Sequence, residues 1–211
     1  MTNYKRQIDL FDPSQFTDRR VVVVGCGNVG SHTALALARM GLSRFVLVDF
    51  DTVEQHNLSS QAYPVDSIGR LKVEVLRDEL TRVNPGVQVE YHTAPYQDAG
   101  VTPDESDILL VAVDTMSTRY EMRDMLAGFA GLIIDGRMGG GQVEAHSGDL
   151  ETWSKTLCED ADTDPCGGRY ISYTSYAVAG LLASVTRLRL LARPVPSSMY
   201  MTLDGFQLLT K

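Results

Sequence analysis

Residues 21–41 read VVVVGCGNVGSHTALALARMG, a short apolar run followed by three glycines and a helical pattern. The four valines at 21–24 are typical of a buried strand, and Gly25, Gly27 and Gly30 have the spacing G-x-G-x-x-G. A strand, glycine loop and helix in this order direct backbone N–H groups and a helix N-terminus toward a phosphate. The stretch therefore predicts a nucleotide-binding loop, but it does not decide which nucleotide binds.

The chain on either side of this stretch alternates between short apolar runs and helical patterns. The runs predict strands at 21–24, 45–48, 87–91, 108–113 and 132–134. Helical patterns follow at about 29–40, 67–83 and 117–128. Strands that alternate with helices are typical of a parallel α/β sheet.

The chain changes character after Asp135. Residues 136–153 alternate like a β-hairpin, 154–170 read as a polar loop, and 198–211 predict a hairpin that turns at Asp204-Gly205. Between them, 175–193 reads as a buried helix whose arginines are expected to complement its C-terminal end: Arg187, Arg189 and Arg193. We expect one α/β domain over 1–211, with a Rossmann-like, mostly parallel sheet, flanking helices and an antiparallel C-terminal extension.

The composition limits the classes of function. The 211 residues are 44% hydrophobic and 22% charged, as expected of a globular domain, and the net charge is −8. An acidic chain is a poor match for nucleic acid or an anionic membrane surface. The polar start MTNYKRQID predicts no signal peptide, and the most apolar helical run is too short to span a bilayer. These features favour a cytoplasmic protein.

A carboxylate stands where a nucleotide-binding fold uses one. Asp49 lies nineteen residues after Gly30, at the end of the predicted strand RFVLVDFD. A carboxylate at that place accepts hydrogen bonds from ribose hydroxyls. The glycine loop and Asp49 fit both a nicotinamide oxidoreductase and an ATP-dependent enzyme.

The motifs that follow separate these possibilities. The string D-F-D-x-V-x-x-x-N-L-x-x-Q, followed by G-x-x-K, resembles the adenylating domain of the ThiF/MoeB family, which includes sulfur-carrier adenylyltransferases and ubiquitin-activating enzymes. Four further stretches are similar to family features. The family's entry helix resembles NYKRQIDLF, and its helix-to-strand turn resembles RVNPGVQVE. Its strand that ends in Asp resembles VAVDTMSTR, and its closing hairpin resembles LDGFQLL. The resemblance covers nearly all of the chain.

The resemblance implies roles for individual residues. Gly25, Gly27 and Gly30, with Asn28 beside them, would approach the nucleotide phosphates, and Asp49 would hold the ribose. Asn57 and Lys72 would point at the triphosphate, where a lysine offsets charge that grows on phosphate oxygens. Asp114 would hold Mg²⁺, with help from Asp51. Arg6 would reach the triphosphate of a neighbouring subunit, which requires a homodimer. These roles make Lys72, Asp114 and Arg6 the expected catalytic residues.

Two departures from the family pattern stand out. The family motif N-L-x-R-Q has an arginine that contacts phosphate, and this chain has Ser60 at that position. Only the structure can show whether Arg70 replaces the arginine. The chain also lacks the two C-x-x-C pairs that hold zinc in many relatives, and its histidines have no ligand spacing: His32, His56, His92 and His146. Zinc is therefore not expected.

A cysteine points to a second chemical step after adenylation. Cys166 resembles the position at which relatives keep a sulfur-transfer or thioester cysteine, and Arg169 with a following helix N-terminus would favour its thiolate. Cys158 lacks such neighbours, and the small size of Cys26 explains its place in the glycine loop.

The expected function is that of an ATP- and Mg²⁺-dependent adenylyltransferase. Its partner would be a small ubiquitin-like or sulfur-carrier protein with a C-terminal glycine, and Cys166 would accept the activated acyl group or carry sulfur. Two alternatives stay open. One is a nucleotide-binding regulatory or scaffold protein that lost catalysis together with the arginine at position 60. The other is a nicotinamide oxidoreductase, against which Lys72 and Asp114 speak.

Overall fold

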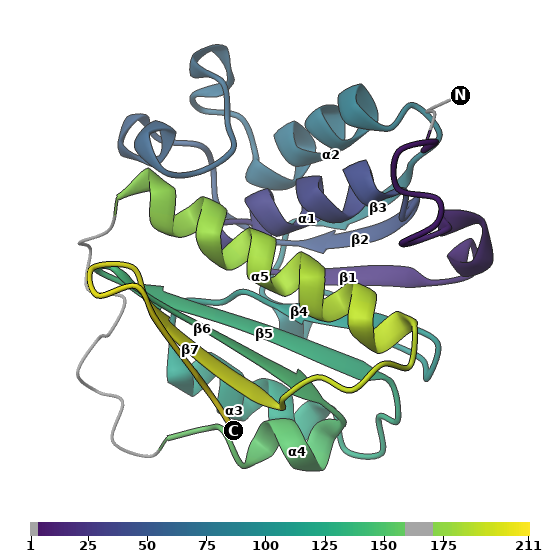
Figure 1. The fold of residues 1–211 in the computed structure, drawn as a ribbon. Helices are drawn as coiled ribbons and strands as arrows, with labels where there is room; N and C mark the ends of the chain where they lie inside the picture. The colour runs from purple at the N-terminus through teal and green to yellow at the C-terminus, as the bar shows by residue number, and fades with distance from the viewer. Residues whose placement is uncertain (1–3, 159–170) are drawn as a thin grey trace.

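The computed structural model describes residues 4–158 and 171–211, and among them forms an eight-stranded sheet (Figure 1). The strand order is β3-β2-β1-β4-β5-β6-β7-β8. The first five strands pair in parallel: β1 (Arg20–Val24), β2 (Arg44–Val48), β3 (Gln88–His92), β4 (Ile108–Val111) and β5 (Leu132–Gly139). The last three pair antiparallel: β6 (Gln142–Gly148), β7 (Ser198–Thr202) and β8 (Gln207–Thr210). The predicted fold class is confirmed.

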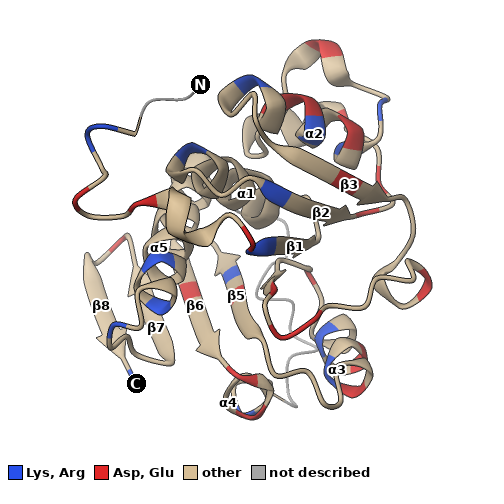
Figure 2. Cartoon of the chain, turned by 90° about the vertical axis from the view of Figure 1, so that its right-hand side faces the viewer, with Lys and Arg blue, Asp and Glu red and all other residues tan. Residues whose placement is uncertain are grey.

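Helices cover both faces of the sheet (Figure 2). On one face lie α1 (Asn28–Met40), α2 (Lys72–Val83) and α5 (Ser172–Leu190). On the other lie α3 (Met116–Met125) and α4 (Leu150–Ser154). Side chains of β1 alternate between the two cores, with Val21 and Val23 facing α1 and with Val22 and Val24 facing Met122 of α3. All four valines are buried on one face or the other, which explains their unbroken apolar run.

The strand order places a binding crevice at the end of β1. This strand lies between β2 and β4. The connection that leaves the C-terminal end of β1 runs to one face of the sheet through α1, and the connection that leaves β4 runs to the other face through α3. A topological switch point of this kind leaves a crevice outside the carboxyl ends of the strands. The glycine loop after β1 and Asp114 after β4 both lie there.

Three local features differ from the sequence prediction. Residues 5–10 form hydrogen-bonded turns rather than an entry helix. The helix predicted to begin at 67 begins at Lys72, because Gly69 has a left-handed φ of +85° and interrupts the helical pattern. The end of the predicted 136–153 hairpin is instead the short helix α4, which Asp149 caps by accepting a hydrogen bond from the backbone N–H of Thr152.

The arginines at the end of α5 make longer-range contacts than predicted. The Arg189 guanidinium donates to the backbone oxygen and the hydroxyl of Ser147 in β6. The Arg187 guanidinium donates to the backbone oxygen of Leu10 in the N-terminal turns. These side chains fasten α5 to two other segments, a role that no local pattern could indicate.

Candidate nucleotide site

A cavity of about 560 Å³ opens at the switch point. Its wall combines the glycine loop, the ends of β2, β4 and β5, and the starts of α2 and α3. Of the predicted site residues, the wall includes Gly25, Gly27, Asn28, Asp49, Asp51, Lys72 and Asp114. Residues far apart in the sequence therefore meet around one space.

The glycines of the loop are required by close backbone contacts. Gly25 has a φ of +90°, and a Cβ atom built on it would lie 2.5 Å from the backbone oxygen of Ala112. A Cβ atom on Gly30 would collide with the backbone oxygen of Gly25. The nearest neighbour of a Cβ atom on Gly27 would be the amide nitrogen of Gln61 at 3.9 Å. The first and third glycines thus shape the turn, while Gly27 keeps its backbone open to the cavity.

Asp49 is tied to the glycine loop. Its Oδ2 accepts from the backbone N–H of Cys26 at 2.6 Å, and its Oδ1 accepts from that of Asp51 at 2.8 Å. Burial raises the pKa of Asp49, while the two backbone hydrogen bonds act in the opposite direction. On the other side of the loop, the buried Tyr63 hydroxyl donates to the backbone oxygen of Cys26. The loop is therefore held in place from both sides.

Lys72 begins α2 and faces the same cavity. It is only 7% exposed, and its Nζ lies 2.7 Å from Oδ2 of Asp51, whose side chain is half exposed. A buried ammonium group needs a partner, and this carboxylate supplies one. An anionic ligand in the cavity could compete with Asp51 for Lys72.

Asp114 follows β4 at the opposite side of the glycine loop from Lys72. It is exposed, and among the described residues no hydrogen bond or ion pair engages its carboxylate. Within those residues there is also no cluster of three or more His, Cys, Asp or Glu suited to a metal. Mg²⁺ needs only one or two carboxylates when phosphate oxygens complete its shell, so Asp114 fits that chemistry.

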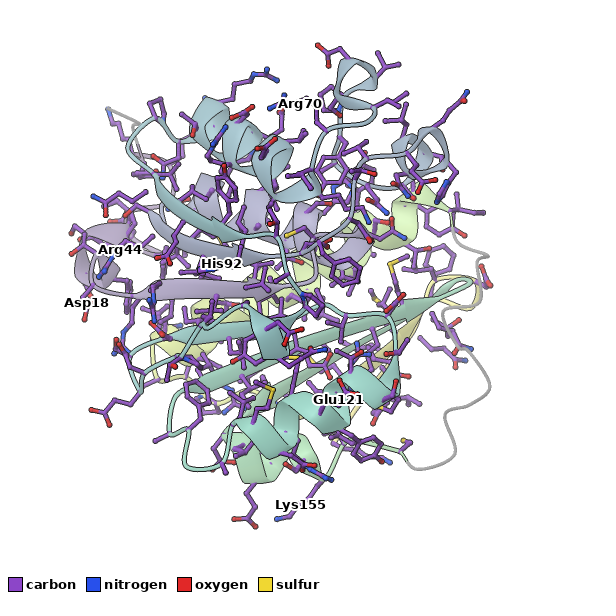
Figure 3. The ribbon with its side chains drawn as sticks, turned by 180° about the vertical axis from the view of Figure 1, so that it is seen from behind. Asp18, Arg44, Arg70, His92, Glu121 and Lys155 are labelled. Carbon is purple, nitrogen blue, oxygen red and sulfur yellow. The ribbon has the colours of Figure 1, made fainter. Side chains whose placement is uncertain are left out.

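Several predicted residues lie off the cavity wall. Asn57 is buried, and its Oδ1 accepts from the backbone N–H of Glu54 in a capping box of the 3₁₀ helix Gln55–Ser59. Ser60 is buried, with an unpartnered hydroxyl among the described residues, while its backbone oxygen contacts His32 Nε2 at 2.9 Å. Arg70 lies at the outer surface near α2 and pairs with Asp78 (Figure 3), so it does not replace the family's arginine.

Arg6 lies in the exposed N-terminal turns. Its neighbour Gln7 donates to the backbone oxygen of Met40, at the end of α1. The glycine loop is at the other end of this 13-residue helix, roughly 20 Å away. Arg6 is thus remote from the cavity of its own chain.

The predicted cysteine lies outside the described residues, as does its neighbour: Cys166 and Arg169. Cys158 is exposed, and its thiol lies 3.8 Å from the backbone oxygen of Thr156. Burial raises the pKa of Cys26 well above its ordinary value, which disfavours the reactive thiolate in the glycine loop.

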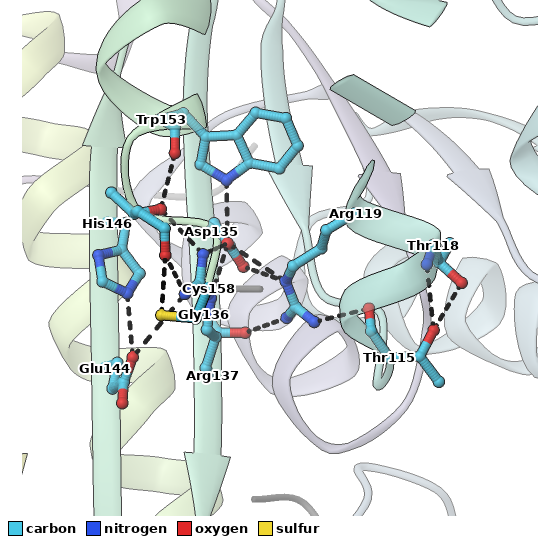
Figure 4. A network of polar contacts seen from close by, with 11 residues as sticks. Thr115, Thr118, Arg119, Asp135, Gly136, Arg137, Glu144, His146, Trp153 and Cys158 are labelled. Atoms are coloured by element: carbon cyan, nitrogen blue, oxygen red, sulfur yellow. Dashed lines mark hydrogen bonds and ion pairs between the residues drawn. The ribbon is translucent and has the colours of Figure 1, made fainter. Parts of the chain in front are cut away.

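The structure adds a buried ionic cluster that the sequence analysis did not identify (Figure 4). Asp135 of β5 is fully buried and accepts hydrogen bonds from Arg119 of α3, Arg137 of β5 and the indole N–H of Trp153. Both arginines line the cavity. Arg119 belongs to the motif VAVDTMSTR, but nothing in the sequence indicates that its partner lies on the next strand.

The cluster makes the stability of the fold sensitive to acid. Burial alone would raise the pKa of Asp135, but the two arginines and Trp153 lower it from 3.8 to about 2. The native carboxylate therefore contributes roughly 2 kcal/mol above pH 4, and this contribution is lost as the pH falls toward 2. We expect the difference in free energy of unfolding between wild type and Asp135→Asn to narrow by about that amount between pH 5 and pH 2.5.

Denaturant unfolding at both pH values measures this difference. Asp124→Asn, which changes an exposed carboxylate on α3, is the control and should leave the pH dependence close to that of the wild type. If the free energy of unfolding changed with pH by the same amount in wild type and in Asp135→Asn, the prediction would be contradicted.

The fold and the site together define an α/β nucleotide-binding domain. The sequence matches the ThiF family over residues 4–208, and the chain belongs to this family. The molybdopterin-synthase adenylyltransferase of Escherichia coli K12 is 36% identical over 130 residues, which cover 58% of this chain and 52% of that protein. The ubiquitin-like modifier-activating enzyme 5 of Caenorhabditis briggsae is 44% identical over 81 residues, which cover 38% of this chain and 19% of that protein. The chain therefore matches about half or less of the length of these relatives.

Solved structures show the same fold. The crystal structure of E. coli MccB with ATP superimposes with a TM-score of 0.77 at 18% identity, covering 94% of this chain and 65% of that one.

Within residues 4–158 and 171–211, no helix combines the length and apolar character that crossing a membrane requires.

Proposed function

We propose that this protein is an ATP- and Mg²⁺-dependent adenylyltransferase that activates the C-terminal carboxylate of a small ubiquitin-like or sulfur-carrier protein. The observation that carries the proposal is the meeting of the glycine loop, Lys72 and Asp114 around one cavity. The relatives named adenylyltransferase and modifier-activating enzyme support it. A nicotinamide oxidoreductase needs no Mg²⁺ beside its dinucleotide, so a carboxylate available for this ion next to a buried lysine favours a triphosphate.

The proposed reaction is a displacement at the α-phosphate. An oxygen of the carboxylate forms a bond to the α-phosphorus, the bond from that phosphorus to the bridging oxygen breaks, and pyrophosphate leaves with the electron pair. The products are an acyl-adenylate and pyrophosphate. The protein contributes by holding the reactants in line and offsetting charge on the phosphate oxygens.

Several residues of the cavity wall have a part in this proposal. The open backbone at Gly27 and the start of α1 bind phosphate oxygens, and Asp49 accepts from the ribose hydroxyls. Lys72 leaves Asp51 for the phosphates. Asp114, with Asp51 once it is released, would hold Mg²⁺, which neutralises phosphate charge when bound. Position 60 supplies no arginine to the cavity, and the neighbouring residue that lines the wall is Gln61, which has a neutral amide.

Arg6 extends the proposal to a homodimer. Because Arg6 is exposed and remote from its own cavity, it can contact a nucleotide only in another subunit. A two-fold symmetric dimer would give each cavity one Arg6 from the partner.

The acyl-adenylate could be passed on to a thiol. Transfer to Cys166 would displace AMP and form a thioester. This step rests on the family resemblance alone. Mass spectrometry of a carrier adduct, with Cys158→Ala as the matched control for Cys166→Ala, would test it.

Pyrophosphate exchange tests the proposed function as a whole. Radiolabel should move from pyrophosphate into ATP only when Mg²⁺ and a small carrier protein ending in Gly-Gly are both present. ATP binding without any exchange would instead identify the alternative, a nucleotide-binding scaffold.

The choice of nucleotide gives a separate prediction. Lys72 and a Mg²⁺ held by Asp114 both favour a triphosphate, so we expect Mg²⁺-ATP to bind at least tenfold more tightly than NAD, a difference of about 1.4 kcal/mol. Calorimetric titration of the purified protein measures both affinities, and omission of Mg²⁺ serves as the control. Equal or tighter binding of NAD would contradict the proposal.

A further inference from the structure

Arg119 and Arg137, the two arginines of the buried cluster, differ in how many of their guanidinium N–H groups donate a hydrogen bond. Arg137 donates to Asp135, to the backbone oxygen and the hydroxyl of Thr156, and lies 4.0 Å from Glu144. These hydrogen bonds engage four of its five N–H groups, and a second carboxylate, that of Glu144, lies near the fifth. Arg119 donates only to Asp135 and to the backbone oxygens of Thr115 and Gly136. A guanidinium carries more N–H donors than these three acceptors use within the described chain.

The charge of Arg119 is also less fully compensated. Asp135 lies closest to Arg137, whose Nη2 is 2.6 Å from Oδ2, and it also accepts from Trp153 at 2.9 Å. The Nε of Arg119 is 3.2 and 3.3 Å from the two carboxylate oxygens. Arg119 is 2% exposed, so water contributes little to its hydration. A buried cation with unused donors on a cavity wall is suited to binding an anion.

The position of Arg119 separates it from the phosphate end of the cavity. Lys72 pairs with Asp51 beyond the end of β2, whereas Arg119 pairs with Asp135 on β5. The strands β1 and β4 lie between β2 and β5, which sets the backbones of β2 and β5 roughly 14 Å apart across the sheet. The two cations are therefore held by carboxylates at different ends of the cavity. If the glycine loop and Lys72 hold the triphosphate, Arg119 faces the other reactant.

We propose that Arg119 is the specificity-determining residue that binds the carboxylate of the acyl substrate, and that Asp135 positions it. This inference rests on the proposed adenylyltransferase function. A planar guanidinium matches a carboxylate in shape and can donate to both of its oxygens. Binding there offsets the repulsion between the carboxylate and the α-phosphate as they approach, and it leaves one lone pair of the attacking oxygen directed at phosphorus.

Trp153 provides a direct probe of this site. It is the single tryptophan of the sequence, it is fully buried, and its indole N–H donates to Asp135. An anion that draws on Arg119 changes the hydrogen bonding of Asp135 and therefore the environment of the indole. Fluorescence emission of Trp153 thus reports binding without any turnover.

The experiment compares a short peptide that ends in Gly-Gly with its C-terminal amide, in the presence of Mg²⁺ and a non-hydrolysable ATP analogue. We expect wild type to bind the acid at least tenfold more tightly than the amide, about 1.4 kcal/mol. Arg119→Lys keeps the charge beside Asp135 but loses the planar fork. The Arg119→Lys variant should therefore bind the acid and the amide with affinities that differ by no more than about twofold. Its affinity for the ATP analogue should stay unchanged.

Arg123→Lys is the matched control, because Arg123 lies one turn further along α3 and pairs with the exposed Asp124. It should retain the preference for the acid. The inference is overturned if wild type shows no such preference, if Arg119→Lys keeps it, or if Arg119→Lys weakens binding of the ATP analogue alone to the same degree. Failure of wild type to bind the ATP analogue at all would count against the proposed function, with the acid-to-amide comparison still deciding the role of Arg119.

Discussion

Replacement of Lys72 with methionine is expected to lower the rate of carrier-dependent pyrophosphate exchange by about 10²–10³-fold, or roughly 3–4 kcal/mol of transition-state stabilisation. The Nζ of Lys72 is buried and faces the cavity, where low exposure to water strengthens its attraction for phosphate oxygens. Methionine has a similar length and tolerates burial. It removes the charge without leaving a large cavity at the start of α2.

The fold should survive this change. Asp51, the partner of Lys72, is half exposed, so water can solvate its carboxylate once the lysine is gone. Lys155→Met is the control, because Lys155 pairs with Glu151 on the outer surface of the protein. Exchange rates for both variants, with melting temperatures to confirm folding, decide the matter. A Lys72→Met protein that retains more than about a tenth of the wild-type rate would contradict the assigned role.

The fold was predictable because its signals are local. The four valines of β1, the glycine loop and the Asp204-Gly205 turn each encode their own conformation, and the structure confirms them within a residue or two. The start of α2 was less predictable, because Gly69 lies within a continuous polar and apolar pattern. The helix α4 was missed because a five-residue helix depends on one cap rather than on periodicity.

The site was predictable only in part. The glycine loop, Asp49, Lys72 and Asp114 follow strand ends or begin helices, so the topology of a parallel sheet brings them together. Asn57 has a side chain that turns to cap its own 3₁₀ helix, a local competition that the motif does not reveal. Arg119 and Asp135 meet across two elements, and Trp153 reaches them from a third. Such a cluster depends on tertiary packing and has no spacing signature.

The position of Arg6 raises the question of how a remote side chain could complete an active site. It is exposed at the end of α1 opposite the glycine loop, so a catalytic role requires a second chain. In a symmetric dimer each cavity would combine Lys72 of its own chain with Arg6 of the other. Either substitution alone, Arg6→Ala or Lys72→Met, should then inactivate both sites of a homodimer.

A mixture of the two inactive variants should recover activity. Subunit exchange at equal concentrations yields mixed dimers as half of the population, and one of the two cavities in each mixed dimer has both Arg6 and Lys72 intact. We therefore expect the pyrophosphate exchange rate to return to about a quarter of the wild-type rate. Mixing either variant with Lys155→Met is the control for activity in a mixture, because half of the wild-type rate is expected there whether or not subunits exchange. Failure to recover activity while native mass spectrometry shows mixed dimers, or a monomer by light scattering under active conditions, would remove Arg6 from the site. Recovery would show that the cavity is completed across the dimer interface.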